Sequence, residues 1–314
     1  MPLRFTLRQL EYLVAVGEAG SIAVAAERIN VSSPSISAAI AHLEQEFGLQ
    51  LFVRRHAQGL SLTSAGRQVY DHARHVLAQA GQLNDLAASI TQTVQGPLHV
   101  GGLITFAQVI LPQLRRSFTD LHPQVDFHQS EGDQPELYDR LRKASLDAAL
   151  GYDLDIPPDL EFVPLASLTP YAVLAAGHPL AAQTTVTPQD LAPHPMVLLD
   201  LPLSAEYFLS CFDAAGLKPR IVERTRDMGV MQSLVGQGFG YSIANIRPWS
   251  DRSPDGQPLR FVPLVGGVRP MQLGLILPPG AQSSLTLRSF VAHCRAQLTP
   301  EKVRSLRPGI DPAA

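Results

Sequence analysis

Three closely spaced glycines and two cysteines are the residues that could support cofactor or metal chemistry in this 314-residue sequence. Gly236, Gly238 and Gly240 have the spacing of a nucleotide-binding loop, but they follow a predicted helix and precede a predicted strand, the reverse of a dinucleotide-binding turn. Cys211 and Cys294 form neither a disulfide framework nor a zinc-site spacing. The sequence contains no G-x-S-x-G, P-loop or H-E-x-x-H motif, and no Ser/His/Asp group is visible from spacing. We therefore predict that the protein is not an enzyme and that it holds no metal or cofactor.

Hydroxyl side chains near the N-terminus suit a different chemistry, namely contact with nucleic acid. Serine hydroxyls both donate and accept hydrogen bonds, so they can contact phosphates or several bases, and a proline beside them can touch a thymine methyl group. Arginines should reach a phosphate backbone. The alternatives are that the serines only cap a helix and that the arginines only solvate the surface. The candidate DNA-contacting residues are Ser32, Ser33, Pro34, Ser35, Ser37, Arg54 and Arg55.

The elements that must position these residues lie within residues 1–64. Leucines from Leu7 onward repeat at helical spacing, and Ser21 can cap a second short helix. A third helix is predicted with Ser33 as its N-cap and Pro34 at its first position, and it ends at Gly48. LQLFVRRHAQGLSLT then reads as two short strands around a polar loop. Three helices and a hairpin predict a winged helix-turn-helix.

A long helix is predicted over residues 65–95, capped by Ser64. An isolated stripe as narrow as its apolar seam would be poorly buried, so we expect a second copy of the helix to cover it and form a homodimer. The alternative is that the helix packs against the C-terminal domain of its own chain. The seam follows steps of four and three residues: Val69, Ala73, Val76, Ala80, Leu83, Ala87, Ile90 and Val94.

Residues 96–300 change to a pattern in which strands alternate with helices, which predicts an α/β domain with a parallel sheet. We expect two lobes joined by crossover strands around a hinged cleft, the first formed by about 96–168 and 266–300 and the second by about 169–265. Residues 301–314 are predicted to be a loose tail. The fold class is therefore α/β with a winged helix-turn-helix head and a long linker helix.

Ligands in open α/β sheets bind beyond the carboxyl ends of the strands and close to helix N-termini. Thr105 and Ser204 are the expected polar anchors, although each could simply cap its helix. Phe106 and Tyr152 could equally be packing residues. The candidate effector-binding residues are Ile104, Thr105, Phe106, Ser130, Glu131, Gly132, Gly151, Tyr152, Asp200, Leu201, Pro202 and Ser204.

Composition sets limits on the whole molecule. The chain has 45% hydrophobic and 17% charged residues, so wholesale disorder is excluded. No apolar run is long enough for a transmembrane helix, and Arg8, Gln9 and Glu11 interrupt the first apolar stretch, which argues against a signal peptide. We therefore expect a cytoplasmic protein with no membrane partner. The net charge of −3 means that any attraction to DNA must be local.

Several segments in this order resemble the LysR-type transcriptional regulators. The pieces are AAE, VS-x-P-x-S, LE-x-x-x-G-x-x-LF-x-R and LT-x-AG in the head, LDAALGY near the end of the first lobe, and LVGQGFGYSI in the second. The resemblance implies a winged DNA-binding head, a dimerising linker helix and an effector domain like a periplasmic binding protein. It also implies a homotetramer that binds an interrupted dyad in double-stranded DNA near a promoter. In such relatives the effector often meets the N-terminus of the first-lobe helix, which places Thr105 first among the candidates.

Two positions depart from the family pattern. Val24 and Ala38 stand where many members carry arginine that serves the DNA. The five arginines of residues 1–65 are matched by five glutamates, so the attraction to DNA is expected to come from Arg54, Arg55 and a helix N-terminus.

The resulting prediction is a sequence-specific DNA-binding transcriptional regulator whose C-terminal domain senses a small-molecule co-inducer. A solute-binding protein is the first alternative, and the winged head and the apparent lack of an export signal argue against it. An enzyme that uses the cleft, or a DNA-binding protein that senses nothing, are further alternatives. Turnover of a bound compound would identify the enzyme, and the lack of any ligand-dependent stabilisation would identify the protein that senses nothing.

Overall fold

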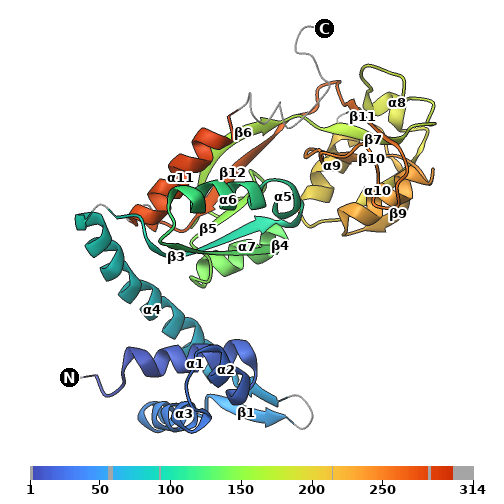
Figure 1. The fold of residues 1–314 in the computed structure, drawn as a ribbon. Coiled ribbons are helices and arrows are strands. Elements are labelled where there is room, and N and C mark those ends of the chain that lie inside the picture. The colour runs from blue at the N-terminus through green and yellow to red at the C-terminus, as the bar shows by residue number, and fades with distance from the viewer. Residues whose placement is uncertain (1–2, 56–58, 92, 214, 282–283, 300–314) are drawn as a thin grey trace. The chain divides into compact units, whose positions relative to one another are not determined.

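The computed structural model describes the chain except at residues 1–2, 56–58, 92, 214, 282–283 and 300–314 (Figure 1). The tail predicted for residues 301–314 lies outside the described residues. Contacts within the chain divide it into two units, one holding residues 1–92 and the other the residues from Thr93 onward apart from Lys143–Ser145.

The first unit begins with a winged helix-turn-helix, as predicted. Thr6 and Gln9 form a reciprocal capping box at the first helix, and left-handed glycines at positions 20 and 48 end the first and third helices. Leu13, Ile36 and Leu43 are fully buried at the centre of its small core. The elements are α1 (Leu7–Ala19), α2 (Ile22–Arg28), α3 (Ser33–Phe47), β1 (Phe52–Arg55) and β2 (Gly59–Leu62), and the two strands pair antiparallel.

The start of α3 differs by one residue from the prediction. Ser32 is the N-cap, and its Oγ accepts a hydrogen bond from the backbone N–H of Ser35 at 3.3 Å. Ser33 is therefore the first helical residue and Pro34 the second. Proline is tolerated at either place, because the first N–H groups of a helix have no partner within the helix.

The long helix α4 spans Ser64–Thr91, so it begins one residue earlier and ends about four residues earlier than predicted. Thr63 caps it, because its Oγ1 accepts from the backbone N–H of Gly66 at 2.8 Å. A Cβ at Gly66 would lie 2.0 Å from the carbonyl oxygen of Leu51, so only glycine allows the helix to start this close to the segment before β1. This contact gives a steric reason for the glycine of the L-T-x-A-G segment.

The first lobe of the second unit contains a five-stranded sheet with the order β4-β3-β5-β12-β6. The first three strands along the chain pair parallel as predicted, but β12 runs antiparallel to both neighbours, so the sheet is mixed rather than parallel. Its strands are β3 (Gly96–Leu103), β4 (Val125–Gly132), β5 (Ala148–Tyr152), β6 (Glu161–Leu168) and β12 (Met271–Leu277).

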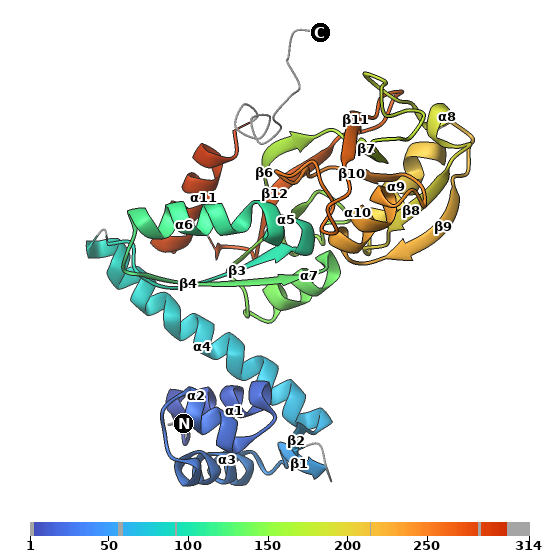
Figure 2. The same ribbon diagram turned by 45° about the vertical axis from the view of Figure 1, so that its right-hand side comes forward.

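Helices cover both faces of this sheet (Figure 2). A Cβ at Gly101 would meet Leu137 on one face, whereas a Cβ at Gly102 would meet Leu111 on the other. The segment between β3 and β4 forms two helices, because Pro112 starts the second one. The helices are α5 (Ile104–Val109), α6 (Leu111–Leu121), α7 (Gln134–Arg142) and α11 (Leu285–Gln297).

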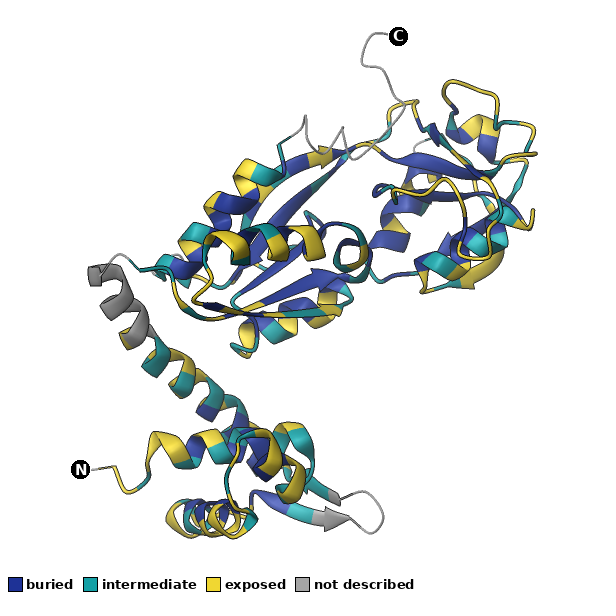
Figure 3. Cartoon of the chain, viewed as in Figure 1, coloured by how far each residue is buried: buried dark blue, intermediate teal, exposed yellow. Residues whose placement is uncertain are grey.

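The second lobe contains an antiparallel sheet of order β10-β7-β11 and a parallel pair β8-β9. The strands β5, β7, β8 and β12 are largely buried, whereas β9 of the second lobe is mostly exposed (Figure 3). Its elements are β7 (Tyr171–Ala175), α8 (Pro188–Leu191), β8 (Pro195–Leu199), α9 (Ser204–Asp213), β9 (Arg220–Thr225), α10 (Met228–Gly236), β10 (Ser242–Ala244) and β11 (Leu259–Pro263).

Two segments connect the lobes: the step from β6 to β7 and the step from β11 to β12. We call residues 168–171 and 263–271 the hinge segments. Asn245 and Tyr207 of the second lobe donate side-chain hydrogen bonds to the carbonyl oxygens of Leu168 (2.8 Å) and Arg269 (2.5 Å). The hydroxyl of Tyr171 donates to the carbonyl oxygen of Ile246.

Candidate effector site and DNA-binding surface

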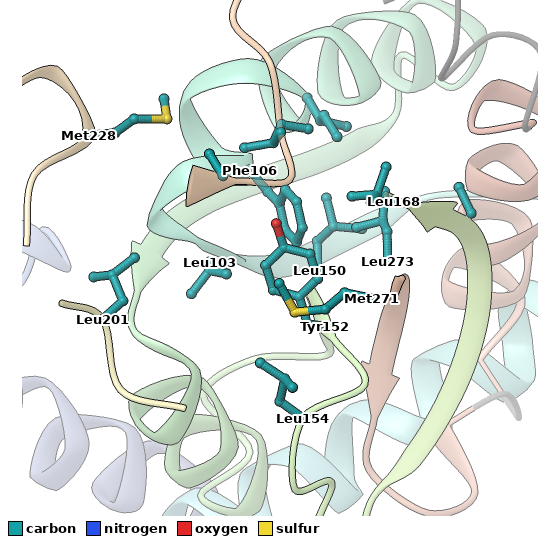
Figure 4. Close-up of a cluster of buried hydrophobic side chains, with 14 of the residues drawn as sticks. Leu103, Phe106, Leu150, Tyr152, Leu154, Leu168, Leu201, Met228, Met271 and Leu273 are labelled. Carbon is teal, nitrogen blue, oxygen red and sulfur yellow. The ribbon is translucent and has the colours of Figure 1, made fainter. Parts of the chain in front are cut away.

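A cavity lies where the carboxyl ends of the first-lobe strands meet the second lobe. Leu103 and Tyr152 border it from the first lobe, and Leu201 and Met228 approach from the second (Figure 4). About 290 Å³ is empty of atoms there, but only about 10 Å³ accepts the centre of a water-sized molecule, which is room for about one water. The cavity is lined by Leu103, Thr105, Tyr152, Leu199, Leu201, Ser204, Phe208, Met228, Ala244, Asn245 and Ile246.

Three polar side chains of this lining are deeply buried and incompletely bonded. Thr105 is 5% exposed, and Ser204 and Asn245 are each 2% exposed. Their Oγ1, Oγ and Oδ1 atoms have no hydrogen-bond partner among the described residues. A buried polar atom without a partner costs about 1–3 kcal/mol, so these three atoms call for hydrogen-bond partners that the described residues do not supply.

The structure contradicts the alternative that Thr105 and Ser204 serve as helix caps. Leu103 is the N-cap of α5 and makes no side-chain capping bond, and Thr105 is the second residue of the helix. Ser204 is the first residue of α9, and Leu203 before it has a left-handed φ of 65°. A left-handed leucine costs about 1–3 kcal/mol, and such strain is concentrated at functional sites.

Tyr152 lies at the cavity, whereas Phe106 lies in the core behind it. Tyr152 lines the cavity, and its complete burial raises the pKa of the phenol well above its usual value. Gln134 fixes the backbone of Tyr152, because the glutamine side chain accepts from its N–H at 3.0 Å and donates to its carbonyl at 2.9 Å. Phe106 lies beside Tyr152 with ring centroids 4.6 Å apart, but it is a core residue outside the lining (Figure 4).

Of the predicted effector residues, Thr105, Tyr152, Leu201 and Ser204 line the cavity. Ser130 instead accepts a hydrogen bond from Arg140 at 2.7 Å, and Asp200 pairs with Arg224 at 3.2 Å. Gly151 is buried against side chains of the first lobe. The predicted residues that do not line the cavity are Ile104, Phe106, Ser130, Glu131, Gly132, Gly151, Asp200 and Pro202.

The sequence reasoning missed seven lining residues. Asn245 and Ile246 follow β10, so the same rule about carboxyl ends of strands, applied to the segment YSIANI, would have found them. Phe208 lies one helical turn after Ser204 on α9. The missed residues are Leu103, Leu199, Phe208, Met228, Ala244, Asn245 and Ile246.

An ion pair joins the two lobes. Arg226, which follows β9, contacts Asp133, which precedes α7, at 2.8 Å. The other carboxylate oxygen of Asp133 accepts from the N–H of Glu136 at 3.0 Å and so caps α7. The same aspartate therefore holds a helix start in one lobe and an arginine of the other.

A second, more open depression lies over α10, and its polar side chains already have partners. Asp227 accepts from the N–H of Val230 at 2.9 Å, and Gln237 donates to Asp255 at 2.8 Å. It therefore lacks the unsatisfied atoms that mark the cavity between the lobes.

The start of α3 presents an exposed polar surface on the head. Ser32, Pro34, Ser35 and Ser37 are exposed and Ser33 is half-buried. The hydroxyls of Ser32 and Ser35 lie 2.7 Å apart, and that of Ser37 donates to the carbonyl of Ser33 at 3.0 Å. The backbones of Arg54 and Arg55 lie in β1, whereas their side chains fall outside the described residues.

The residues of the α4 seam lie in different environments along the helix. Ala73 is buried in the core of the head and Val69 packs against it. Val76 is 41% and Leu83 is 70% exposed. Val94 lies beyond the end of the helix and packs against the core of the second unit. The side chains of Ala87 and Ile90 lie outside the described residues.

A winged helix-turn-helix joined by a long helix to a two-lobe domain defines a DNA-binding transcriptional regulator with an effector domain. The family model "LysR substrate binding domain" matches residues 91–299, and "Bacterial regulatory helix-turn-helix protein, lysR family" matches residues 7–67. The chain therefore belongs to the LysR family of transcriptional regulators.

Known proteins resemble it over nearly its whole length. The transcriptional activator protein LysR of Escherichia coli (strain K12) is 29% identical over 301 residues, which cover 96% of this chain and 95% of that protein. The crystal structure of HinK, a LysR family transcriptional regulator from Pseudomonas aeruginosa, is 35% identical with a TM-score of 0.64, covering 94% of this chain and 99% of that one. Full-length CbnR, solved in complex with its target DNA, is 26% identical with a TM-score of 0.66, covering 93% and 99%.

No described helix is long and apolar enough to cross a membrane. Among the described residues there is no group of three or more His, Cys, Asp or Glu side chains that could hold a metal ion.

Proposed function

We propose that the cavity between the lobes is the effector site of this regulator. The observation that carries the proposal is the set of unpartnered polar atoms on Thr105, Ser204 and Asn245. A ligand that bonds to them would recover the free energy that their burial costs. The large share of apolar lining residues fits a small-molecule site, where a few polar groups fix the orientation.

Occupancy of this site would reach the hinge segments through short connections. Asn245 lines the cavity, and its Nδ2 donates a hydrogen bond to the carbonyl oxygen of Leu168. Ile246 also lines the cavity, and its carbonyl accepts from Tyr171 just after β6. A ligand that moves these two residues changes the angle between the lobes, which is a hinge motion of the kind found in ligand-responsive proteins.

The exposed start of α3 would read DNA. Ser32, Ser33, Pro34, Ser35 and Ser37 occupy the end of a recognition helix that enters the major groove, where short side chains permit close approach. Such side chains specify bases weakly, so the shape of the DNA would contribute to selectivity. Arg54 and Arg55 in the wing would contact the phosphate backbone.

The exposed part of the α4 seam would pair with a second copy of the chain. Val76 and Leu83 are large apolar side chains without cover in the single chain. A dimer that pairs these helices brings two heads together on an interrupted dyad near a promoter, and a second interface between the α/β domains would make a tetramer. The protein would act in the cytoplasm, where promoters are, and would return its ligand unchanged instead of turning it over.

The effector site is tested by letting the full-length protein select its ligand from a small-molecule extract of its host, followed by mass spectrometry. We expect one compound to be retained by the wild type and lost in Ser204→Phe, which fills the cavity. Ser242→Ala is the matched control, because Ser242 is also buried with an unpartnered hydroxyl but lies outside the lining. Equal retention by wild type and Ser204→Phe would place the effector elsewhere.

A further inference from the structure

The lining of the cavity also restricts the charge of the molecule that fills it. Eight of the lining residues are apolar or aromatic and three are neutral and polar, so no lysine, arginine, aspartate, glutamate or histidine is among them. Burying a charge without a partner costs far more than burying a neutral polar group. A charged ligand would therefore need compensation from outside the lining.

The N-termini of α9 and α10, which lie beside the cavity, do not provide this compensation. In α9 the backbone N–H groups of Ser204, Ala205 and Tyr207 already donate to carbonyls of the preceding loop, at 2.8, 2.9 and 3.2 Å. The N-terminus of α10 is capped by the carboxylate of Asp227, which would repel an anion. Helix dipoles and unsatisfied N–H groups attract anions only where those groups remain available.

Charged side chains on neighbouring segments are also engaged. Asp200 precedes the lining residue Leu201 and is paired with Arg224 at 3.2 Å. Arg226 precedes Asp227 and is paired with Asp133 at 2.8 Å. Binding of a charged ligand by any of these groups would first have to break an existing ion pair.

The three neutral polar residues define the hydrogen bonds that the ligand must make. The Nδ2 of Asn245 donates to the carbonyl of Leu168, so the amide orientation is fixed and Oδ1 remains as an acceptor. The hydroxyls of Thr105 and Ser204 do not cap their helices, so each can donate a hydrogen bond to a ligand. The ligand therefore needs one donor for Asn245 and one acceptor for the hydroxyls.

We infer that the effector is a small, uncharged, mostly apolar molecule that carries both a hydrogen-bond donor and an acceptor, as a primary amide does. This inference rests on the proposed effector site and specifies the chemistry of its ligand. The cavity holds about one water in this arrangement of the lobes, so binding of a larger ligand requires the lobes to part.

Thermal unfolding of the full-length protein at pH 7 tests the inference with four probes that share one ring: benzamide, benzoate, benzylamine in its protonated form, and toluene. We expect benzamide to raise the Tm most, by about 3–6 °C at ten times its Kd. Benzoate and benzylammonium carry a charge on the same ring, and toluene makes no hydrogen bonds. We therefore expect each of these three probes to raise the Tm less than benzamide does.

Two variants remove single hydroxyls from the lining. Thr105→Val and Ser204→Ala should each raise the Tm of the ligand-free protein by about 2–4 °C, because each deletes a buried hydroxyl that has no partner. Each should lose at least half of the benzamide shift. The control Ser242→Ala should gain similar stability and keep the full shift, since Ser242 lies outside the lining.

The other outcomes overturn the inference in distinguishable ways. A larger shift with benzoate or benzylammonium that disappears in Thr105→Val shows that the ligand class is wrong while the effector site stands. A benzamide shift that both lining variants retain shows binding elsewhere and contradicts the effector site as well. No shift with benzamide up to its solubility limit overturns the ligand class.

Discussion

The proposed effector site rests on single buried atoms of three side chains. A native fold leaves few buried polar atoms unsatisfied, and each one calls for an explanation. In this chain three such atoms belong to residues that line one cavity and come from three different elements, α5, α9 and the end of β10. Their convergence is the physical basis for assigning the site.

Gly66 provides a test of the packing in the head. Gly66→Ala would place a Cβ 2.0 Å from the carbonyl oxygen of Leu51, so we expect a loss of about 1–3 kcal/mol in the free energy of unfolding. The control is Gly81→Ala on the same helix, where nothing lies within 4 Å of the new Cβ and the protein should gain about 0.5–1 kcal/mol. Urea unfolding of both variants measures the difference, and equal stabilities would contradict the close approach.

The two cysteines provide a test of burial. Burial raises the pKa of the Cys211 thiol to about 12 and that of Cys294 well above its usual range. A raised pKa favours the neutral thiol, so thiolate is scarce at pH 8, and stability should fall as the pH rises above about 9, where the unfolded thiols ionise. We expect neither thiol to react with an aromatic disulfide reagent in the native protein and both to react in denaturant. Rapid reaction of the native protein would show that the thiols are accessible.

At the residue scale, the sequence pointed to two residues that line the cavity, Thr105 and Ser204, but the alternative that they cap their helices was wrong. Thr105 and Ser204 follow from the rule about carboxyl ends of strands, yet only the structure shows that neither caps its helix. Phe106 was placed with them by the same rule, with packing as the alternative, and its side chain is buried in the core. Asn245 was not predicted, although the same rule covers it because it lies directly after β10.

At the scale of elements, α4 connects the DNA-binding and effector functions. Its first turns complete the core of the head, while its middle turns carry apolar side chains that the single chain does not cover. The helix length and the heptad seam were visible in the sequence, because steps of four and three residues need no tertiary information. The C-terminal end of the helix was not visible in the sequence, since Val94 continues the heptad pattern but packs into the second unit.

Leu83→Glu tests the pairing of α4. A charge at the centre of an apolar seam should weaken the dimer at least tenfold, which is about 1.4 kcal/mol, and should weaken DNA binding with it. Leu121→Glu is the matched control, because Leu121 is exposed to a similar extent on α6 and is not part of the seam. Sedimentation equilibrium measures both variants, and an unchanged dimer in Leu83→Glu would show that α4 is not the interface.

Asp133→Asn tests the ion pair between the lobes. Asparagine still caps α7, so the change removes mainly the charge that faces Arg226. Because the pair is partly exposed, we expect less than about 1 kcal/mol of lost stability. We also expect faster hydrogen exchange in the hinge segments. Asp159→Asn is the control, since its partner Arg142 belongs to the same lobe, and equal exchange in both variants would mean that the pair does not restrain the lobes.

The sequence pattern did not reveal the strand β6. β6 contains Pro164 and pairs only with β12, so it is an edge strand, where proline is tolerated, and the pairing shifts register beside this proline. The antiparallel direction of β12 in the sheet was also not predicted. This direction is set by the return of the chain from the second lobe and not by the residue pattern of the strand.

At the scale of the whole molecule, we expect a ligand bound between the two lobes to act on two DNA-binding heads. The hinge segments receive hydrogen bonds from the cavity side, and the linker helix offers a seam for a partner. Ligand binding can change DNA binding only by its differential affinity for the two lobe arrangements. The effect on DNA should therefore vanish when the cavity loses the atoms that hold the ligand.

The most direct test is the DNase I footprint and bend angle of the full-length protein on DNA selected from a random library, with and without the compound retained from the host extract. We expect two symmetric half-sites, and a footprint and bend that change when the compound saturates the wild type but not when it is added to Thr105→Val. An identical footprint and bend for the wild type with and without saturating compound would contradict this expectation.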